Sequence, residues 1–316
     1  MKSLLSFVIL LVSVYTYSHE AVIDRGESGV VRVCQTEKAK YAFRIELANL
    51  ILKKTATVYG ESEVVTFRRE DLSISQDRCI ELLKGKRLDL LYLPPKESLL
   101  TNFSYIPFDI HAGMLGYRVF LIRKHQAPDF QRIQTLDDLR SFTGGFGKQW
   151  GDFKVFALNG LPVEGAANSS VLMKMLRHNR FDYFHRGLHE AWAELEASPE
   201  FANDLMVEET IALRYPFQVF YWFHKDNEYL KQRFERGLLL VLQDGSYRAL
   251  FKKHFNELVE KAKLHQRTII DIKYPMSDEV RQWLEDKPIE PFWLEQAPLI
   301  SAPLSIVPSE TSPKGN

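Results

Sequence analysis

Short apolar runs alternate with amphipathic segments from residue 29 onward. Residues 29–36 (GVVRVCQT) predict a buried strand, and residues 41–56 carry apolar positions at the spacing of a packed helix. A second strand is predicted at EVVTFRR, and residues 79–93 predict a helix, a turn and a third strand. Strands and helices alternating in steps of this length indicate parallel pairing and an α/β architecture.

The second half of the chain repeats this pattern. Two long apolar strands, 116–124 (GYRVFLIRK) and 216–226 (PFQVFYWFHKD), each end in basic residues and bracket a middle α/β segment. We interpret them as crossover strands between two lobes, with hinge closure about residues 117–122 and 219–223. Two helices meeting at Gly245 follow the second crossover strand.

This order predicts two lobes, each a mostly parallel sheet flanked by helices, joined by the two crossover strands. Lobe 1 is expected to contain residues 29–116 and 225–275, and lobe 2 residues 117–224. Residues 287–316 form a Pro- and Ser-rich C-terminal tail.

The N-terminus predicts export. Lys2 precedes an apolar stretch that is too short to span a bilayer comfortably, and Thr16 and Ser18 suit the cleavage positions of a signal peptide over residues 1–18. No cysteine follows for lipid attachment, so we expect a periplasmic protein. The formal net charge of +0 and 45% hydrophobic residues indicate a globular chain without the electrostatic footprint of a nucleic-acid binder.

The two cysteines of the chain, Cys34 and Cys79, permit one disulfide in an oxidising compartment. The alternative is two buried free thiols, because cysteine is among the most buried residue types. Nothing in the spacing suggests a metal site or a catalytic thiol.

A co-linear series of motifs resembles a known family. LDLLYLPP, FSYIPF and GYRVFLIRK occur in the order of the strand, FS-x-P segment and crossover strand of amino-acid-binding type II periplasmic solute-binding proteins, the substrate-binding components of ABC transporters. LDDLRSF, MLRHNRFDYFHRG and LQDGSYRALFKKHF resemble the second lobe and closing helices. The resemblance covers residues 29–272 and is closest to a branch with a DYF-x-RG signature. It implies the two-lobed periplasmic-binding-protein type II fold.

The charged positions depart from that family. Its amino-acid binders place an arginine, which takes the ligand carboxylate, where this chain has Lys96 and Glu97. They place an aspartate, which takes the ligand ammonium, where this chain has His185 and Arg186. With Lys148 added, these cations predict an anionic or carboxylate-bearing ligand rather than a plain amino acid.

The strongest candidate site is RFDYFHRGLHEAW, residues 180–192. Taking residues 181–184 as a strand, His185 and Arg186 would project from its carboxyl end toward the crevice between the lobes. Arg186 offers a planar fork for a carboxylate, whereas the competing interpretation is a surface arginine paired with Glu190 four residues later. The spacing of His185 and His189 permits a metal pair, but no third ligand is placed, so we expect neither metal nor cofactor.

Further candidate walls come from both predicted lobes. The glycine-rich turn TGGFGKQWGDF could bind an anion through its backbone N–H groups, and its Lys148 and Trp150 add a positive charge and a stacking ring. Asn168 and Ser169 either cap a helix or donate hydrogen bonds to the ligand. In lobe 1, Tyr41 lies in the turn after the first predicted strand, and Phe108 and Asp109 lie beside the first crossover strand. The ligand-binding candidates are Tyr41, Lys96, Phe108, Gln149, Trp150, Ser169, His185, Arg186 and Glu190.

These features predict a monomeric solute-binding protein that closes on a small ligand and delivers it to an ABC-type membrane permease. A sensory protein that docks on a receptor would have the same sequence features. An exported enzyme using His185, His189 and Glu190 for acid–base work is the third interpretation, because imidazole titrates near neutral pH. Gly-x-Ser-x-Gly is absent, and neither cysteine lies in a nucleophile motif, so we expect a non-enzymatic protein.

Overall fold

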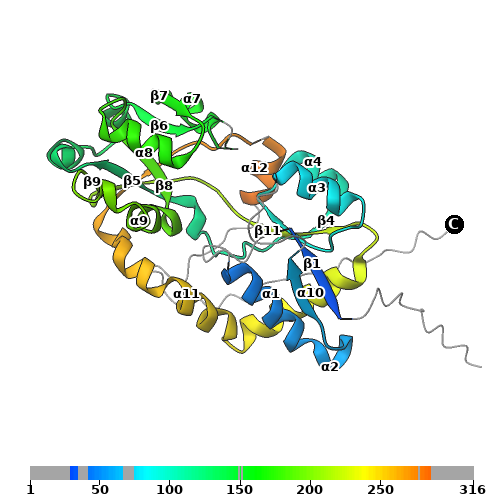
Figure 1. Cartoon of the computed structure of the whole chain (residues 1–316). Coiled ribbons are helices and arrows are strands. Elements are labelled where there is room, and N and C mark those ends of the chain that lie inside the picture. Colours follow the sequence, from blue (N-terminus) through cyan, green and yellow to red (C-terminus); the bar gives the residue numbers. More distant parts are fainter. Residues whose placement is uncertain are drawn as a thin grey trace, which may run out of the picture.

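The computed structural model describes residues 29–34, 42–66, 75–148, 150, 152–276 and 278–285. The predicted signal peptide (1–18) and C-terminal tail (287–316) lie outside these ranges. None of the helices in the described part combines the length and apolar composition needed to cross a membrane. Two α/β lobes lie side by side, one built mainly from the first hundred residues and the other from the middle of the chain (Figure 1).

The first lobe contains a sheet with strand β11 at its centre. Strand β11 pairs antiparallel with both β3 and β4, while β1 and β2 form a separate parallel pair, and an isolated bridge joins Val33 of β1 to Leu90, the residue before β3. The strands are β1 (Val30–Val33), β2 (Glu63–Thr66), β3 (Leu91–Leu93), β4 (Phe103–Ile106) and β11 (Phe220–His224). The helices are α1 (Ala42–Lys54), α2 (Ala56–Tyr59), α3 (Gln76–Lys84), α4 (Glu97–Asn102) and α10 (Glu228–Gln243).

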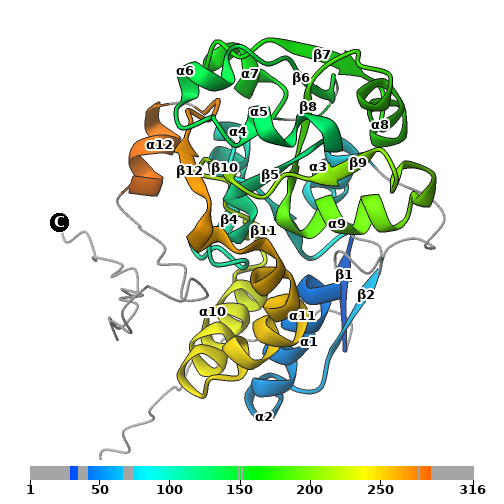
Figure 2. The same cartoon turned by 90° about the vertical axis from the view of Figure 1, so that its left-hand side faces the viewer.

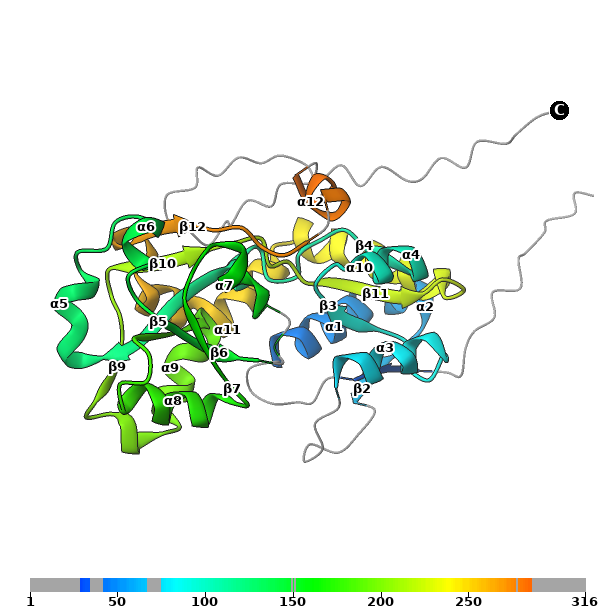
Figure 3. The same ribbon diagram turned by 90° about the horizontal axis from the view of Figure 1, so that it is seen from above.

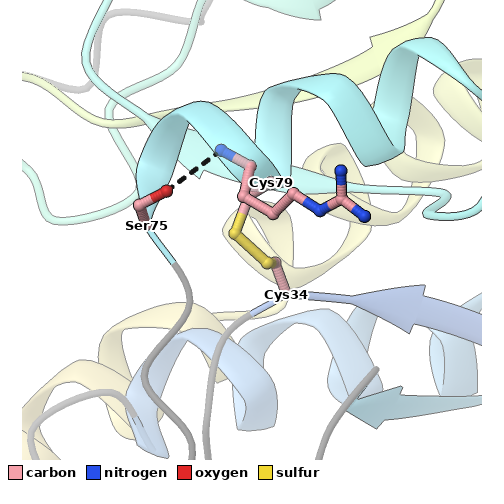
Figure 4. The surroundings of a disulfide bond; sticks show 4 residues. Cys34, Ser75 and Cys79 are labelled. Atoms are coloured by element: carbon pink, nitrogen blue, oxygen red, sulfur yellow. Dashed lines mark hydrogen bonds between the residues drawn. A yellow bond between two sulfur atoms is a disulfide. The ribbon is translucent and has the colours of Figure 1, made fainter.

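A disulfide joins the end of β1 to helix α3 (Figure 4). Cys34 and Cys79 have Cα atoms 5.9 Å apart, within the usual span of a disulfide. Helix α3 begins at Ser75, whose hydroxyl accepts a hydrogen bond from the backbone N–H of Arg78 at 3.3 Å. The pairing that the sequence left open is therefore formed, and it ties the first strand of the lobe to a helix 45 residues further along the chain.

The second lobe contains a seven-stranded sheet in the described residues, in the order β12–β10–β5–β8–β6–β7, with β9 also paired to β5. Its strands are β5 (Tyr117–Arg123), β6 (Gly144–Gly147), β7 (Val163–Ala166), β8 (Tyr183–Gly187), β9 (Leu205–Val207), β10 (Ile211–Arg214) and β12 (Thr268–Asp271). Its helices are α5 (Ala127–Phe130), α6 (Leu136–Leu139), α7 (Lys154–Leu158), α8 (Ser169–Arg177) and α9 (Leu188–Glu196). All seven side chains of β5 are buried, because this strand lies in the middle of the sheet.

Two predicted lobe boundaries are wrong. Strand β11 was expected in lobe 2, but it pairs with β3 and β4 and so belongs to the first sheet. Strand β12 was expected in lobe 1, but it pairs parallel with β10 in the second sheet. The reason is physical: an apolar run shows that a strand is buried, whereas its neighbours in the sheet depend on the path of the whole chain.

The crossover strands are also placed differently. Residues 117–122 and 219–223, expected to be hinges, lie mostly within β5 and β11, where ladder hydrogen bonds hold the backbone. The chain changes lobe just outside them, at residues 107–116 and 215–219. Asp109, fully buried, ties these two crossover segments together because its carboxylate accepts hydrogen bonds from the N–H groups of His111, Gly113 and Val219.

Helix α11 (Ser246–Ala262) makes a third passage between the lobes. It packs on α1 of the first lobe and α9 of the second, and leads into β12 (Figure 2). Phe255 contacts Phe43 of α1, whereas Lys261 pairs with Glu196 at the end of α9. The turn into α11 contains Gly245 at φ +77°, a backbone conformation that favours glycine, as the predicted helix boundary required.

Candidate functional site

Strand β8 carries the most prominent candidate residues, and its register decides what they can do. The strand runs from Tyr183 to Gly187 rather than over residues 181–184, and it aligns His185 with Phe120 and Arg186 with Val119 of β5. His185 and Arg186 therefore lie inside the strand and not beyond its end. Successive strand residues point to opposite faces, so the two side chains diverge instead of reaching one crevice together.

Arg186 is held by groups of the protein itself. Its guanidinium donates to both oxygens of Glu194, at 2.9 and 2.6 Å, and lies 2.8 Å from Glu190. The same group stacks 4.8 Å from the Trp150 ring and 5.1 Å from the Phe184 ring, and the residue is 6% exposed. Of the two interpretations of Arg186, pairing with Glu190 is the one present, in a buried rather than a surface setting.

His185 lies on the other face of β8, among aromatic rings. Its ring centroid is 5.0 Å from Phe156 in a stacked arrangement and 4.5 Å from Phe146. Neither ring nitrogen has a hydrogen-bond partner among the described residues, and burial holds the pKa of His185 well below its usual value. His185 is thus a neutral core imidazole, and it does not form a hydrogen-bonded acid–base cluster with Glu190.

Arg118, which was not predicted from the sequence, is a buried arginine at the boundary between the second lobe and the crossover segments. It belongs to β5 directly after the first crossover segment, and its guanidinium lies 3.5 Å from Asp152 and 3.8 Å from Glu190. The guanidinium also lies over the rings of Tyr215 (5.1 Å) and Phe217 (4.8 Å). Its Nε atom is buried and has no partner in the described part of the chain.

The surroundings of Arg118 are shaped by a glycine and a tyrosine. A Cβ atom at Gly187 would lie 3.0 Å from the Arg118 guanidinium and 2.9 Å from the His189 ring, so glycine lets both approach the strand. The hydroxyl of Tyr215 donates to Asp152 at 3.0 Å and fixes that carboxylate. One sequence signal could have identified Arg118: it is a charged residue inside the otherwise apolar start of a long strand.

The first lobe contributes a second buried arginine, Arg44, and the first crossover segment contributes a buried histidine, His111. Arg44 of α1 donates to Nε2 of His111 at 3.3 Å. Burial keeps the pKa of His111 well below its usual value, so the ring is neutral and Nδ1 carries its proton. Helix α9, which carries His189 and Glu190, packs against residues 114–116 of the first crossover segment. Burial, and to a lesser extent the positive charge of Arg44, lowers the pKa of both His111 and His189.

Burial lowers the pKa of His189 to about 4, and its Nδ1, like that of His111, lacks a partner among the described residues. We call the set Arg44, His111, Arg118, Asp152, His189 and Glu190 the interlobe cluster. Buried polar atoms without partners are costly in a protein interior. A bound ligand that touches both lobes would satisfy several of them at once.

The remaining predicted residues do not converge on the interlobe cluster. Lys96 is exposed and precedes α4, and Phe108 packs its ring 5.6 Å from that of Tyr247. Ser169 is the first residue of α8, next to Asn168, which caps that helix by accepting from the Val171 N–H. Trp150 packs on Arg186, and Glu190 belongs to the cluster. Tyr41 and Gln149 lie outside the described residues.

The prediction of an anionic ligand, which rested on Lys96, Lys148 and Arg186, is therefore not supported. Arg186 is paired, Lys96 lies at the surface, and the side chain of Lys148 passes over Gly165 of β7. In the interlobe cluster and its Arg186–Glu194 extension, three guanidinium groups accompany three carboxylates. Within the described ranges, no group of three or more His, Cys, Asp or Glu residues is arranged to hold a metal ion.

Comparisons with known proteins agree with this architecture. No protein-family model matches the chain, and no curated protein matches it in sequence. Among solved structures, an ancestral arginine-binding protein bound to arginine aligns with a TM-score of 0.51 at 18% identity, over 72% of this chain and 98% of that one. An ancestral amino-acid-binding protein, described as a precursor of cyclohexadienyl dehydratase, aligns with a TM-score of 0.50 at 14% identity, over 72% and 96%. The chain therefore has the two-lobed α/β fold of the amino-acid-binding type II periplasmic solute-binding proteins.

Proposed function

We propose that the protein binds a small solute between its lobes and presents it to a partner in the membrane. The observation that carries this proposal is the interlobe cluster, in which buried polar groups of both lobes lie around the first crossover segment, with several atoms unpartnered in the described residues. A ligand that contacts both lobes stabilises their closed arrangement, and a membrane partner can then recognise the closed, ligand-bound form.

The cluster favours a ligand with both hydrogen-bond donors and acceptors. Arg118 and the protonated Nδ1 of His111 supply donors, while Asp152 and Glu190 supply acceptors. Because positive and negative groups are balanced, a neutral or zwitterionic solute suits the cluster better than a simple anion. An ancestral protein of similar fold binds arginine, so amino acids and their derivatives are the first class to test.

The export signal predicted from the sequence and the two-lobed fold favour delivery to an ABC-type permease from outside the cytoplasmic membrane. The alternative partner is a sensory receptor that docks the closed form. A catalytic function finds less support, because His185 is buried in the aromatic core rather than joined to His189 and Glu190. Recovery of the ligand unchanged after incubation tests this point directly.

The experiment is a thermal-shift screen of the mature protein against amino acids, short peptides, dicarboxylates, sugars and inorganic anions, followed by calorimetry on any hit. Ligand at a hundred times its Kd adds about 2.7 kcal/mol to the free energy of unfolding. Asp152→Asn tests the cluster, and Arg132→Ala is the control because Arg132 is 80% exposed on a distant surface.

A ligand that stabilises the wild type and Arg132→Ala, but stabilises Asp152→Asn much less, supports the proposal. Equal stabilisation of all three proteins would place the ligand elsewhere on the fold. If no compound in the panel changes the melting temperature, the solute-binding function is refuted for these ligand classes.

A further inference from the structure

The chain passes between the lobes once more after β12, and this last passage is built differently from the others. Residues 272–276 leave the second lobe, and helix α12 (Asp278–Glu285) lies against the first lobe near α4 (Figures 1 and 3). We propose that this segment, which we call the C-terminal strap, restrains the opening of the two lobes. The inference goes beyond solute binding and can be tested without a ligand.

The strap is fixed to the second lobe by hydrogen bonds of its backbone and by aromatic contacts. The N–H of Ile272 donates to the carbonyl of Arg214 at 2.9 Å and so extends the β10–β12 pairing. The side-chain amide of Asn159 donates to the backbone carbonyl of Lys273 and accepts from its backbone N–H, each at 2.8 Å. These contacts hold the start of the strap to the edge of the second sheet.

Next to these contacts, Tyr274 reaches the second crossover segment. Its ring stacks on that of Tyr215 with the centroids 5.3 Å apart and the planes 11° from parallel, and it meets the Phe217 ring edge-on at 5.7 Å. Tyr215 in turn holds Asp152 of the interlobe cluster through its hydroxyl. The strap therefore contacts the second crossover segment directly and is linked to Asp152 of the interlobe cluster through Tyr215.

The other end of the strap is anchored in the first lobe by apolar burial. Val280 is 2% exposed and belongs to the apolar cluster formed by α3, α4, β3, β4 and β11, with Leu82, Leu99 and Trp222 among its members. Met276 packs on the same cluster. The next residue of α12, Arg281, is exposed, and its ion-pair partner among the described residues is Asp278 on the same helix.

Opening of the lobes that separates these two anchors must remove Val280 from its cluster or detach the strap from β10 and Asn159. Burial of an apolar side chain is favourable in proportion to the area removed from water, so either event makes the open arrangement less populated. The two crossover segments alone would impose no such cost, since hinge residues absorb opening by rotating backbone angles. The strap thus shifts the resting population toward closed lobes and lowers the conformational cost of ligand binding.

The test measures the distance between the lobes in the full-length mature protein by double electron–electron resonance. Spin labels are attached at Val58→Cys on α2 and Val171→Cys on α8, which are 58% and 40% exposed on different lobes. Both native cysteines are in the disulfide and do not take up label. In this background, Val280→Asp and the milder Val280→Ala release the anchor, and Arg281→Ala is the matched control at an exposed position of the same helix.

We expect a narrow distance distribution in the parent protein and in Arg281→Ala. Val280→Asp should broaden the distribution and increase the population of the open arrangement by about tenfold or more, with Val280→Ala intermediate. If Val280→Asp loses its near-UV circular dichroism, the comparison of Val280→Ala with Arg281→Ala decides the question. A folded Val280 variant with the distance distribution of Arg281→Ala would overturn the proposal.

Discussion

Replacing Arg186 with methionine distinguishes the two roles considered for this residue. In the structure Arg186 is an internal ion-pair partner: its side chain is 7% exposed and contacts Glu190 and Glu194, which are 16% and 22% exposed. Arg186→Met keeps much of the apolar contact with Trp150 and Phe184 but leaves both carboxylates with one fewer cation. We therefore expect a large loss of stability.

The magnitude follows from the burial of the pair. Removing one partner of a buried ion pair costs about 3–5 kcal/mol, and the lower end applies because both carboxylates retain some solvent. Glu190 also retains Arg118 at 3.8 Å and the N–H of Gly187. A loss of about 3 kcal/mol corresponds to a decrease of the melting temperature of about 6–12 °C at roughly 2–4 °C per kcal/mol.

The assay is urea unfolding at pH 7, followed by circular dichroism and tryptophan fluorescence, with Arg132→Met as the control. Arg132 is 80% exposed and lies 3.7 Å from Asp129, so its removal should cost about 0–1 kcal/mol. If Arg186→Met is as stable as Arg132→Met, the buried network does not support the fold as described. If it is also unable to bind a ligand that the wild type binds, Arg186 is the ligand-binding cation that the sequence suggested.

Two further predictions concern the disulfide and the hinge. Replacing Cys34 and Cys79 together with serine should lower the free energy of unfolding by about 4 kcal/mol for a sequence separation of 45 residues, and adding reductant should then change the variant less than the wild type. Burial raises the pKa of Asp109 to about 6, above its unfolded value of about 3.9. Its contribution to stability is therefore present below about pH 4 and lost as the pH rises through 6, which amounts to roughly 3 kcal/mol. Asp109→Asn should flatten the pH dependence of urea unfolding between pH 4 and 7, and an unchanged slope would contradict the assignment.

The local elements could be predicted because their determinants are local. Helix α1 and helices α10 and α11 lie where apolar spacing and Gly245 placed them. The capping role of Asn168 also follows from its position before an amphipathic segment. Each of these features depends on residues within a few turns of one another.

The candidate site could be predicted only in part, because its assignments depend on register and partners. A strand boundary displaced by two residues places His185 and Arg186 inside β8, on opposite faces of the sheet. The partners of Arg186 could be foreseen only for Glu190, four residues away, and not for the Trp150 ring. Arg118 was not identified because the role of a charged residue in an apolar strand depends on its partners, and those of Arg118 lie far away in the sequence.

By itself the sequence determined the α/β class, the two-lobed order of elements and the identity of the only two cysteines. Only the tertiary structure decided which lobe each late strand joins, where the hinges lie and which charged groups meet between the lobes. Periodic patterns indicate which face of each segment is buried, but the same pattern of burial is compatible with many arrangements of the segments. Ion pairs such as Arg118 with Asp152, and the contact of Val280 with the first lobe, depend on distances between segments far apart in the chain.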